Sequence, residues 1–216
     1  MERGVPQGSV LGPILFNLFI NDLEKGINSE VAKFADDTKL FKIVKTKADC
    51  EELQKALTKL TDWATKWQMK LNVDKCKVMH TGKNNPNDTY STMGANLATT
   101  NQEKDLGVIV GSSLKTSTQC AAAVKKANGM LGIIKKGIES KMENILLPLY
   151  KSMVHPHLEY CIQMWSPHLK KDILALEKVQ KRATKMIRGL EWVPYEERLE
   201  ARTFQLGKEE SKGGYD

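Results

Sequence analysis

Residues 29–44 read SEVAKFADDTKLFKIV, which is two extended runs separated by the adjacent acids Asp36 and Asp37. Alternation of apolar and polar side chains predicts one strand from Ser29 to Ala35 and another from Thr38 to Val44. Two strands so close in the sequence pair as an antiparallel hairpin. We therefore expect both acids to lie at the tip of a hairpin.

Helices are predicted on both sides of this hairpin. Pro13 suits the first turn of a helix that ends near Glu24. The apolar residues of that helix fall on one face: Leu11, Ile14, Leu15, Leu18 and Phe19. A longer helix is expected from Asp49 to about Met69, opened by a capping box of Asp49 and Glu52. Its buried stripe is predicted to be Leu53, Leu57, Leu60, Ala64 and Trp67.

Short strands are predicted farther along, at Lys75–Thr81 and Asp105–Val110. The Asn, Pro and Gly residues of Gly82–Asp88 predict a loop between them. Together with the hairpin, these strands predict an antiparallel sheet with helices on one face. The expected fold class is therefore α+β.

Beyond Gly111 the apolar period becomes helical, with a stripe of Cys120, Val124, Ala127, Leu131, Ile134 and Ile138. A second helix is expected over Lys141–Met153, kinked by Pro148 and ended by Pro156. A third is expected over Lys170–Leu190, with Ile173, Leu176, Val179, Ala183, Met186 and Leu190 inward. A domain boundary is therefore predicted near residue 112.

Three segments follow from these patterns. Residues 1–111 should form the mixed domain, and residues 112–199 a helical region that closes with a short helix over Tyr195–Leu199. Residues 200–216 lose the apolar pattern, and we expect them to form an irregular, mobile tail.

Charge is concentrated in the helical region. The chain of 216 residues carries a formal charge of +7, and residues 109–190 alone hold 14 Lys and Arg against 5 Asp and Glu, a net charge of +9. A basic stretch of this size suits a polyanion such as nucleic acid. A solvated face on surface helices would have the same composition, so charge by itself leaves both interpretations open.

Cysteine usage and hydropathy bear on location. Four cysteines lie far apart without a CxxC pair, which predicts reduced thiols in an intracellular protein of the nucleus or cytoplasm. Zinc is the weaker alternative, and its candidate ligands are Cys76, His80, His155, His157 and Cys161. No apolar run approaches the ~20 residues of a membrane span, so no membrane is expected as a partner.

The two acids at the hairpin tip are the first candidates for chemistry. Adjacent carboxylates offer the oxygen ligands that Mg²⁺ prefers, together with phosphate oxygens. An Asp-Asp pair is more often an ordinary polar turn, however. The pair therefore needs support from the rest of the sequence.

Five motifs supply that support. They are VPQGSVLGPILF at residues 5–16, FADD at 34–37, LNVDKC at 71–76, KDLGV at 104–108 and HPHLEYC at 155–161. In this order, and with Gln7 and Asp36 separated by 29 positions, the chain resembles the reverse transcriptases of LINE-type (non-LTR) retrotransposons. The resemblance extends to about Leu199. It implies a truncated polymerase palm followed by an all-helical, thumb-like region.

The resemblance also implies roles for single residues near the acids. Asp36 would be a ligand of a two-metal centre of Mg²⁺, with Mn²⁺ as an alternative, and Asp37 its partner. Lys75 would help to neutralise or protonate pyrophosphate, although a lone lysine is more often a surface charge. The residues expected to contact nucleotide or template are Pro6, Gln7, Gly8, Phe34 and Ala35. Phe34 is as readily explained as a core aromatic residue.

Farther along the chain, the resemblance implies contacts with RNA template, DNA primer or their hybrid, and with dNTP in the intact enzyme. Leu106 and Gly107 would belong to a hairpin that holds the primer end. Nine cations would follow the nucleic-acid backbone: Lys125, Lys126, Lys135, Lys136, Lys178, Lys181, Arg182, Lys185 and Arg188. Trp165 and Trp192 could stack on bases, but packing against helices is the favoured interpretation.

The sequence departs from the family ahead of Gly4. Only Met1, Glu2 and Arg3 stand where the family has a strand with another metal-binding aspartate, preceded by fingers. We therefore expect no polymerase activity from this chain by itself, and an exposed sheet edge with uncovered apolar surface. The alternatives are a nucleic-acid-binding module without catalysis, or the product of a degraded element.

Overall fold

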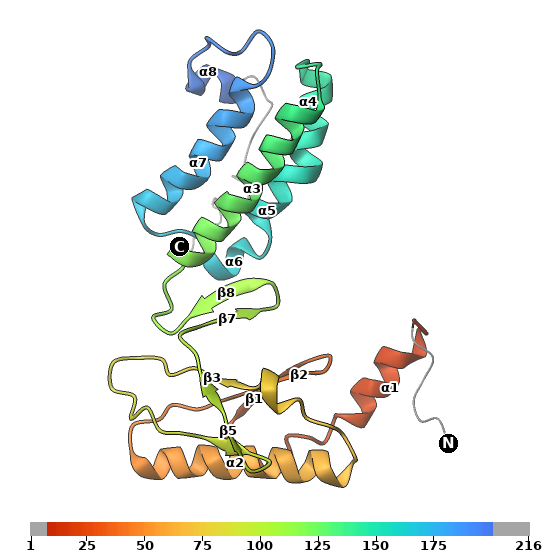
Figure 1. Ribbon diagram of the computed structural model, residues 1–216, viewed down its shortest axis with the longest axis vertical. Helices are drawn as coiled ribbons and strands as arrows, with labels where there is room; N and C mark the ends of the chain where they lie inside the picture. Colours follow the sequence, from red (N-terminus) through yellow and green to blue (C-terminus); the bar gives the residue numbers. More distant parts are fainter. Residues whose placement is uncertain (1–7, 201–216) are drawn as a thin grey trace, which may run out of the picture. The chain divides into compact units, whose positions relative to one another are not determined.

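The computed structural model describes residues 8–200 and divides after Asn101 into two compact units (Figure 1). The first unit mixes a hairpin, a long helix and short strand pairs, and the second is mostly helical. The α+β class predicted from the sequence is confirmed. The predicted tail from residue 201 onward lies outside the described residues.

The first unit begins with helix α1 (Leu11–Phe19), followed by strands β1 (Glu30–Phe34) and β2 (Asp37–Phe41) and helix α2 (Lys47–Lys66). The expected inward face of α1 is exposed, with exposed fractions of 62% for Leu11 and 68% for Leu18. The chain after α1 supplies the buried residues instead, Ile20 and Leu23. This face of α1 is apolar, and the described residues do not cover it.

Aromatic contacts attach α1 to α2. The Phe19 ring meets the Trp63 and Trp67 rings edge-on, with centroid separations of 5.8 and 5.5 Å. The Trp63 Nε1–H donates to Asp22 Oδ1 over 2.9 Å. Trp67, which was predicted to be buried, is 43% exposed because it lies at the C-terminal end of α2, at the edge of this cluster.

Helix α2 starts earlier than the sequence predicts. Thr46, not Asp49, is the N-cap residue: its Oγ1 accepts from the Asp49 backbone N–H over 3.3 Å. The Asp49 carboxylate returns the bond by accepting from the Thr46 backbone N–H over 2.8 Å. The predicted box of Asp49 and Glu52 is therefore wrong by one turn, and Glu52 pairs with Lys42 instead.

The strands form four separate two-stranded pairs in the described residues, rather than the single antiparallel sheet that was predicted. The predicted strand over Lys75–Thr81 is a 3₁₀ turn (Val73–Lys75) followed by the two-residue strand β3 (Lys77–Val78). Strand β3 pairs in parallel with β6 (Ala98–Thr99), and the antiparallel pair β4 (Ser91–Thr92) and β5 (Ala95–Asn96) lies between them in sequence. Because these strands are short and are separated by loops, they do not join into one continuous hydrogen-bonded sheet.

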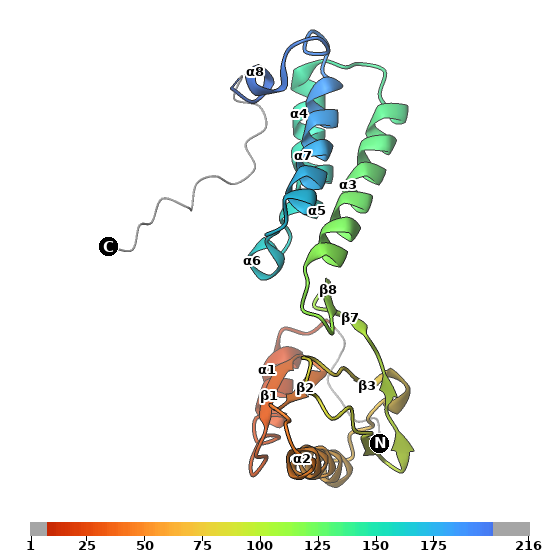
Figure 2. The same cartoon turned by 90° about the vertical axis from the view of Figure 1, so that its left-hand side faces the viewer.

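The second unit begins with a hairpin of β7 (Gln102–Asp105) and β8 (Val108–Gly111), so a turn interrupts the strand predicted over Asp105–Val110. The helices that follow are α3 (Ser117–Gly137), α4 (Glu143–Leu149), α5 (His155–Glu159), α6 (Ile162–Trp165), α7 (Lys170–Lys185) and α8 (Tyr195–Glu200). Helix α3 packs against α5 and α7, and Figures 1 and 2 show these helices side by side. Their shared core includes Cys120, Ala127, Leu131, Val179 and Ala183, as the predicted stripes required, whereas Ile173, also predicted inward, is 40% exposed.

Pro156 does not end a helix, contrary to prediction. Helix α4 runs through Pro148 into a π-helical turn (Tyr150–Val154), and α5 continues from His155. Pro156 occupies the first turn of α5, where a missing N–H costs little. The wider π-helical turn lets the chain remain helical from Glu143 to Glu159.

None of the helices within residues 8–200 is long and apolar enough to cross a lipid bilayer.

Replacing Thr46 by Ala should lower the free energy of unfolding by about 1 kcal/mol, because an N-cap hydrogen bond is lost. Urea denaturation followed by circular dichroism measures the change. Thr65→Ala, an exposed substitution inside the same helix, is the matched control and should cost less. An equal loss from both variants would contradict the assigned cap.

The Asp49 carboxylate should add stability only while it is charged. Hydrogen bonds from the Lys45 N–H, then from the Thr46 hydroxyl and N–H, hold its pKa below the ordinary 3.8. The folded state thus favours the carboxylate, and this stability is complete above pH 3.8 and is lost as pH falls through the folded-state pKa.

Asp49→Asn should therefore be less stable than wild type at pH 7, and the difference should shrink below about pH 4. Urea unfolding at a series of pH values tests this. Asp62→Asn, on an exposed part of the same helix, is the control. A difference that is independent of pH would contradict the role of the Asp49 charge.

Candidate functional site

The β1–β2 hairpin places the acid pair at its tip. Phe34 pairs with Asp37, so only Ala35 and Asp36 make the turn, and Asp37 opens β2. Ala35 has φ +50°, in the left-handed region that is costly for any residue with a Cβ. Both carboxylates are exposed to solvent. The hairpin register forces this strained turn, and strain of this kind often marks functional sites.

Contacts at both ends of the hairpin hold it on the first unit. The Lys33 Nζ donates to the Ile20 carbonyl oxygen over 3.3 Å and lies 3.6 Å from a Glu24 carboxylate oxygen. Lys42, at the other end of the hairpin, pairs with Glu52 of α2. Lys33 thereby ties the end of β1 nearest the turn to the segment after α1, and Lys42 ties the base of the hairpin to α2.

Phe34 lies beside the acids on the exposed side of the hairpin. Its exposed fraction is 61%, so the interpretation of Phe34 as a core aromatic residue is wrong. An exposed aromatic ring beside two carboxylates is available to a ligand.

The donor set at the tip fits a hard cation in part. Asp36 and Asp37 offer carboxylate oxygens, which suit Mg²⁺ or Mn²⁺. Within residues 8–200, no group of three or more His, Cys, Asp or Glu side chains is placed to hold a metal ion. That finding covers the acid pair as well as the Cys76 and His155 sets considered for zinc.

Among the other predicted residues of the first unit, Lys75 and Gly8 are exposed. Lys75 is exposed at the end of the 3₁₀ turn, and no ion pair in the described residues joins it to Asp36 or Asp37. Gly8 is exposed, with φ +82° and open space where a Cβ would point. Pro6 and Gln7 lie outside the described residues.

The second unit holds its hairpin tip with a tyrosine. Leu106 and Gly107, the two turn residues, have φ +43° and +89°, which fits a two-residue turn of type I′. The Tyr160 hydroxyl, from the end of α5, donates to the Leu106 carbonyl oxygen over 2.8 Å. A Cβ on Gly107 would lie 2.9 Å from Tyr160 Cε1, so any larger residue there would require the Tyr160 ring to shift.

Two further contacts fix the same hairpin on the helices. Val108 is buried in the helical core, and the Ile109 N–H donates to Gln119 Oε1 of α3 over 2.9 Å. This hairpin was predicted to belong to residues 1–111, and the structure packs it in the second unit. Tyr160 was not singled out from the sequence, although it stands inside the HPHLEYC motif.

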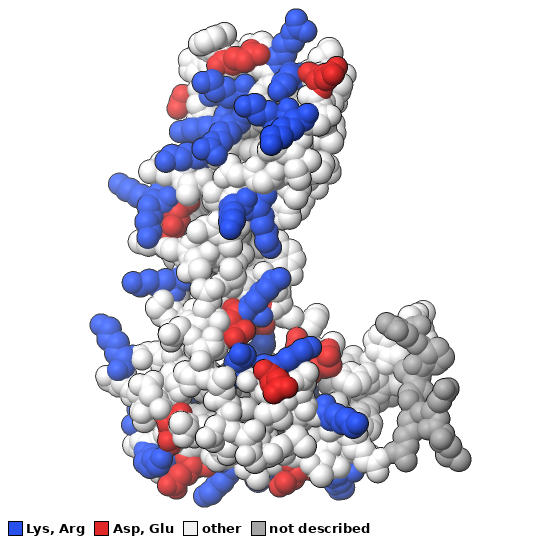
Figure 3. Space-filling model, viewed as in Figure 1, with Lys and Arg blue, Asp and Glu red and all other residues white. Residues whose placement is uncertain are grey.

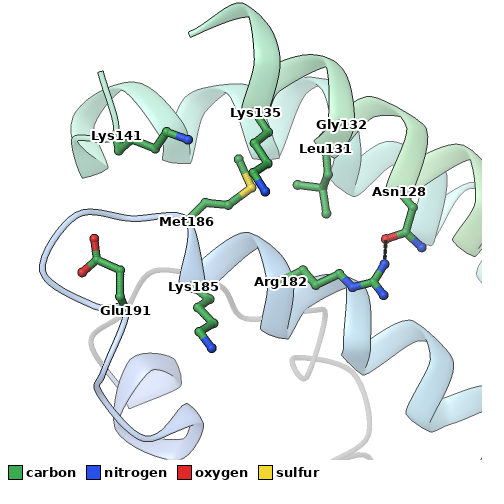
Figure 4. Close-up of a pocket in the computed structure, with 9 residues that line it drawn as sticks. All are labelled: Asn128, Leu131, Gly132, Lys135, Lys141, Arg182, Lys185, Met186 and Glu191. Atoms are coloured by element: carbon green, nitrogen blue, oxygen red, sulfur yellow. Dashed lines mark hydrogen bonds between the residues drawn. The ribbon is translucent and has the colours of Figure 1, made fainter. Parts of the chain in front are cut away.

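Basic side chains gather over the helices of the second unit, on the face shown in Figure 3. Among the predicted cations, Lys135, Arg182 and Lys185 line a cavity of about 600 Å³ between α3 and α7. Lys141 and Asn128 also line it, and neither was among the residues predicted to bind. Figure 4 shows the Arg182 guanidinium donating to Asn128 Oδ1, a bond of 2.9 Å.

The other predicted cations lie outside this cavity. Lys125, Lys126, Lys136, Lys178 and Arg188 are exposed. Lys181 forms an ion pair with Glu177 over 3.9 Å, and its Nζ lies 4.5 Å from the centre of the Tyr195 ring. The Lys181 ammonium group therefore already interacts with residues of its own unit.

The two tryptophans of the second unit have opposite environments. Trp165 is buried, and its Nε1–H donates to the Tyr160 carbonyl oxygen over 2.8 Å, which confirms the packing interpretation. Trp192 is 94% exposed, so the packing interpretation is wrong for that residue. A loop after α7 carries it, beyond the reach of the helical stripe.

Comparison with known proteins identifies the family of the chain, with a match that extends past the first unit into helix α3. Residues 1–123 match the family described as reverse transcriptase (RNA-dependent DNA polymerase). The chain therefore belongs to the reverse transcriptase family, and the resemblance to LINE-type retrotransposon enzymes is confirmed. No solved structure matches the chain significantly.

Curated relatives extend the likeness into the helical unit. The RNA-directed DNA polymerase from mobile element jockey of Drosophila funebris is 30% identical over 214 residues, covering 89% of this chain and 22% of the relative. The protein of the same description from Drosophila melanogaster is 28% identical over 207 residues, with the same coverage. The chain thus spans about a fifth of the length of these relatives.

Gly107→Ala should destabilise the second unit for two separable reasons. The left-handed backbone costs about 1–2 kcal/mol with a Cβ, and contact with the Tyr160 ring adds to this cost. In a Tyr160→Ala background the contact is gone, so the cost of Gly107→Ala should fall. Denaturant unfolding of the four proteins of this double-mutant cycle measures the coupling.

Gly94→Ala is the matched control for the turn. Met93 and Gly94 also have positive φ, of +49° and +79°, but no atom lies within 4 Å of a Cβ there. The loss of unfolding free energy in Gly94→Ala should therefore come only from the left-handed backbone conformation. Zero coupling between Gly107 and Tyr160 would contradict the contact.

Proposed function

We propose that the chain is the part of an RNA-directed DNA polymerase that carries the acid pair of the catalytic centre and a helical surface for nucleic acid. The observation that supports this proposal is the position of Asp36 and Asp37 at an exposed hairpin tip, in a chain of the reverse transcriptase family. In this proposal the first unit is part of the palm, and the second is the thumb.

In the proposed reaction, the primer 3′-oxygen bonds to the α-phosphorus of a dNTP, and the bond to pyrophosphate breaks. Mg²⁺ or Mn²⁺, when bound, activates the 3′-hydroxyl and stabilises the departing pyrophosphate. Asp36 and Asp37 hold the cations through carboxylate oxygens. Phe34, exposed beside them, packs against the primer-template, while Gly8 and Ala35 bring backbone close to it.

The remaining predicted residues bind pyrophosphate, the primer end and the nucleic-acid backbone. Lys75 neutralises pyrophosphate, and Leu106 and Gly107 hold the primer end with the Tyr160 hydroxyl fixing their turn. The exposed cations of α3 and α7 contact backbone phosphates of the RNA template and DNA primer. Support for this last role comes from the excess of basic side chains on these helices.

A second candidate function is nucleic-acid binding without catalysis. The basic cavity between α3 and α7 favours it, since that cavity needs no metal ion. The two candidates make different demands on Asp36. Catalysis requires its carboxylate, whereas binding by the helices does not.

For the 216-residue chain by itself we expect no dNTP incorporation, because two cations beside a triphosphate need more carboxylates than this pair. A chimera tests the proposal, in which this chain replaces the matching segment of the Drosophila funebris jockey polymerase. Primer extension on an RNA template with Mg²⁺ should proceed. Asp36→Asn should reduce it by at least about 10³-fold, or about 4 kcal/mol in activation free energy.

Asp62→Asn, an exposed substitution on α2, is the matched control and should extend the primer normally. Binding of the primer-template by each chimera, measured separately, shows whether the protein is folded. Undiminished extension by Asp36→Asn would reject the catalytic role. A chimera that binds primer-template but never extends it favours the binding module.

A further inference from the structure

The cavity between α3 and α7 has two kinds of lining. Four cations surround it, namely Lys135, Lys141, Arg182 and Lys185. Its apolar lining comes from Leu131, Gly132 and Met186 (Figure 4). The cations come from both helices and from the segment before α4, so residues far apart in the sequence meet here.

The charges at this cavity call for an anion. Four positive side chains line one opening, and the lining contains a single acid, Glu191. One oxygen of that acid, Oε2, accepts from the Gly189 N–H over 2.7 Å. Like charges this close repel one another, and a bound anion would relieve that repulsion. Arg182 is held by Asn128 and keeps further N–H donors for a phosphate.

A phosphate by itself would leave most of the cavity unused. The volume of about 600 Å³ falls within the range for small-molecule sites, which are mostly apolar with a few polar groups. Met186 and Leu131 offer a polarisable and an aliphatic surface to a flat ring. Gly132 has no Cβ, and open space lies where one would point. A ring and an anion together match this lining better than an anion does.

An exposed aromatic ring stands next to this lining in the chain. Trp192 follows Glu191 directly and is 94% exposed. Exposed aromatic rings among basic side chains are the usual platforms on which unpaired bases stack. A base in the cavity and a neighbouring base on Trp192 would belong to one unpaired strand.

We infer that this cavity binds one unpaired nucleotide, with its base against Leu131, Gly132 and Met186 and its phosphate between Arg182 and Lys185. The inference goes beyond the proposed function, since backbone contacts to a paired hybrid need no such cavity. It also requires neither a metal ion nor the acid pair. The nucleotide comes either from a single-stranded extension of a hybrid or from free nucleotide, and the test distinguishes these sources.

The test compares two probes in EDTA, which separates it from the metal chemistry of Asp36. One probe is an RNA–DNA hybrid with a single-stranded extension that contains 2-aminopurine, and the other is a blunt hybrid with the same number of phosphates. The wild-type chain should bind the extended probe about tenfold more tightly, as expected for one stacked base. The fluorescence of 2-aminopurine should change on binding.

Gly132→Leu fills the cavity without changing charge, and should reduce the tenfold preference to about onefold. Gly129→Leu is its matched control: the same helix, the same substitution, open space around the Cβ, and a position outside the cavity lining. It should keep the preference. Both changes replace a helical glycine by a better helix former, so both should fold.

Charge variants provide an independent readout. Lys185→Gln should reduce the preference for the extended probe, whereas Lys126→Gln, exposed on α3 outside the lining, should weaken binding to both probes equally. Adenosine monophosphate is added as a competitor in the same assay. If it displaces 2-aminopurine from the proteins whose cavity is intact but not from Gly132→Leu, and neither hybrid is preferred, the cavity binds free nucleotide. Equal binding of both hybrids together with no effect of the monophosphate would overturn the inference, as would an unchanged preference in Gly132→Leu.

Discussion

The pairing of Phe34 with Asp37 is the constraint on which the candidate catalytic site depends. It leaves two residues to reverse the chain, so Ala35 must adopt a left-handed backbone conformation. The register of a hairpin is fixed by its turn and its side-chain pattern, and a slip by one residue would move each side chain to the other face. Strand pairing up to the turn therefore determines where the two carboxylates lie.

In the second unit, helix α3 determines where the candidate binding residues lie. One stripe of α3 forms the core with α5 and α7, while its exposed face carries the lysines. The N-terminal end of the same helix supplies Gln119, which accepts from the β8 backbone. Packing of α3 thus sets the positions of a hairpin at one end and of a basic cavity along its side. Burial of the apolar stripe provides the stability that keeps these like charges close.

Long helices with a strongly periodic apolar stripe were predicted well from the sequence. Features that depend on contacts between distant residues were not. The stripes of α3 and α7 were predicted because burial on one face of a long helix imposes a regular spacing. The cap of α2 was misplaced because Thr46 and Asp49 fit the same local pattern as Asp49 and Glu52. Pro156 was misread because a π-helical turn, which no local pattern announces, let the helix continue through it.

The sequence by itself determined the family, the acidic hairpin tip and the basic helices, because motif order, strand alternation and charge are all properties of the chain read along its length. Only the tertiary structure decided that Tyr160 closes over Gly107, that Trp192 is exposed, and that Lys141 and Asn128 join three predicted cations around one cavity. These facts depend on which surfaces meet when helices pack. Helix packing brings together residues that are dozens of positions apart in the sequence, and the spacing of residues along the chain does not predict these contacts.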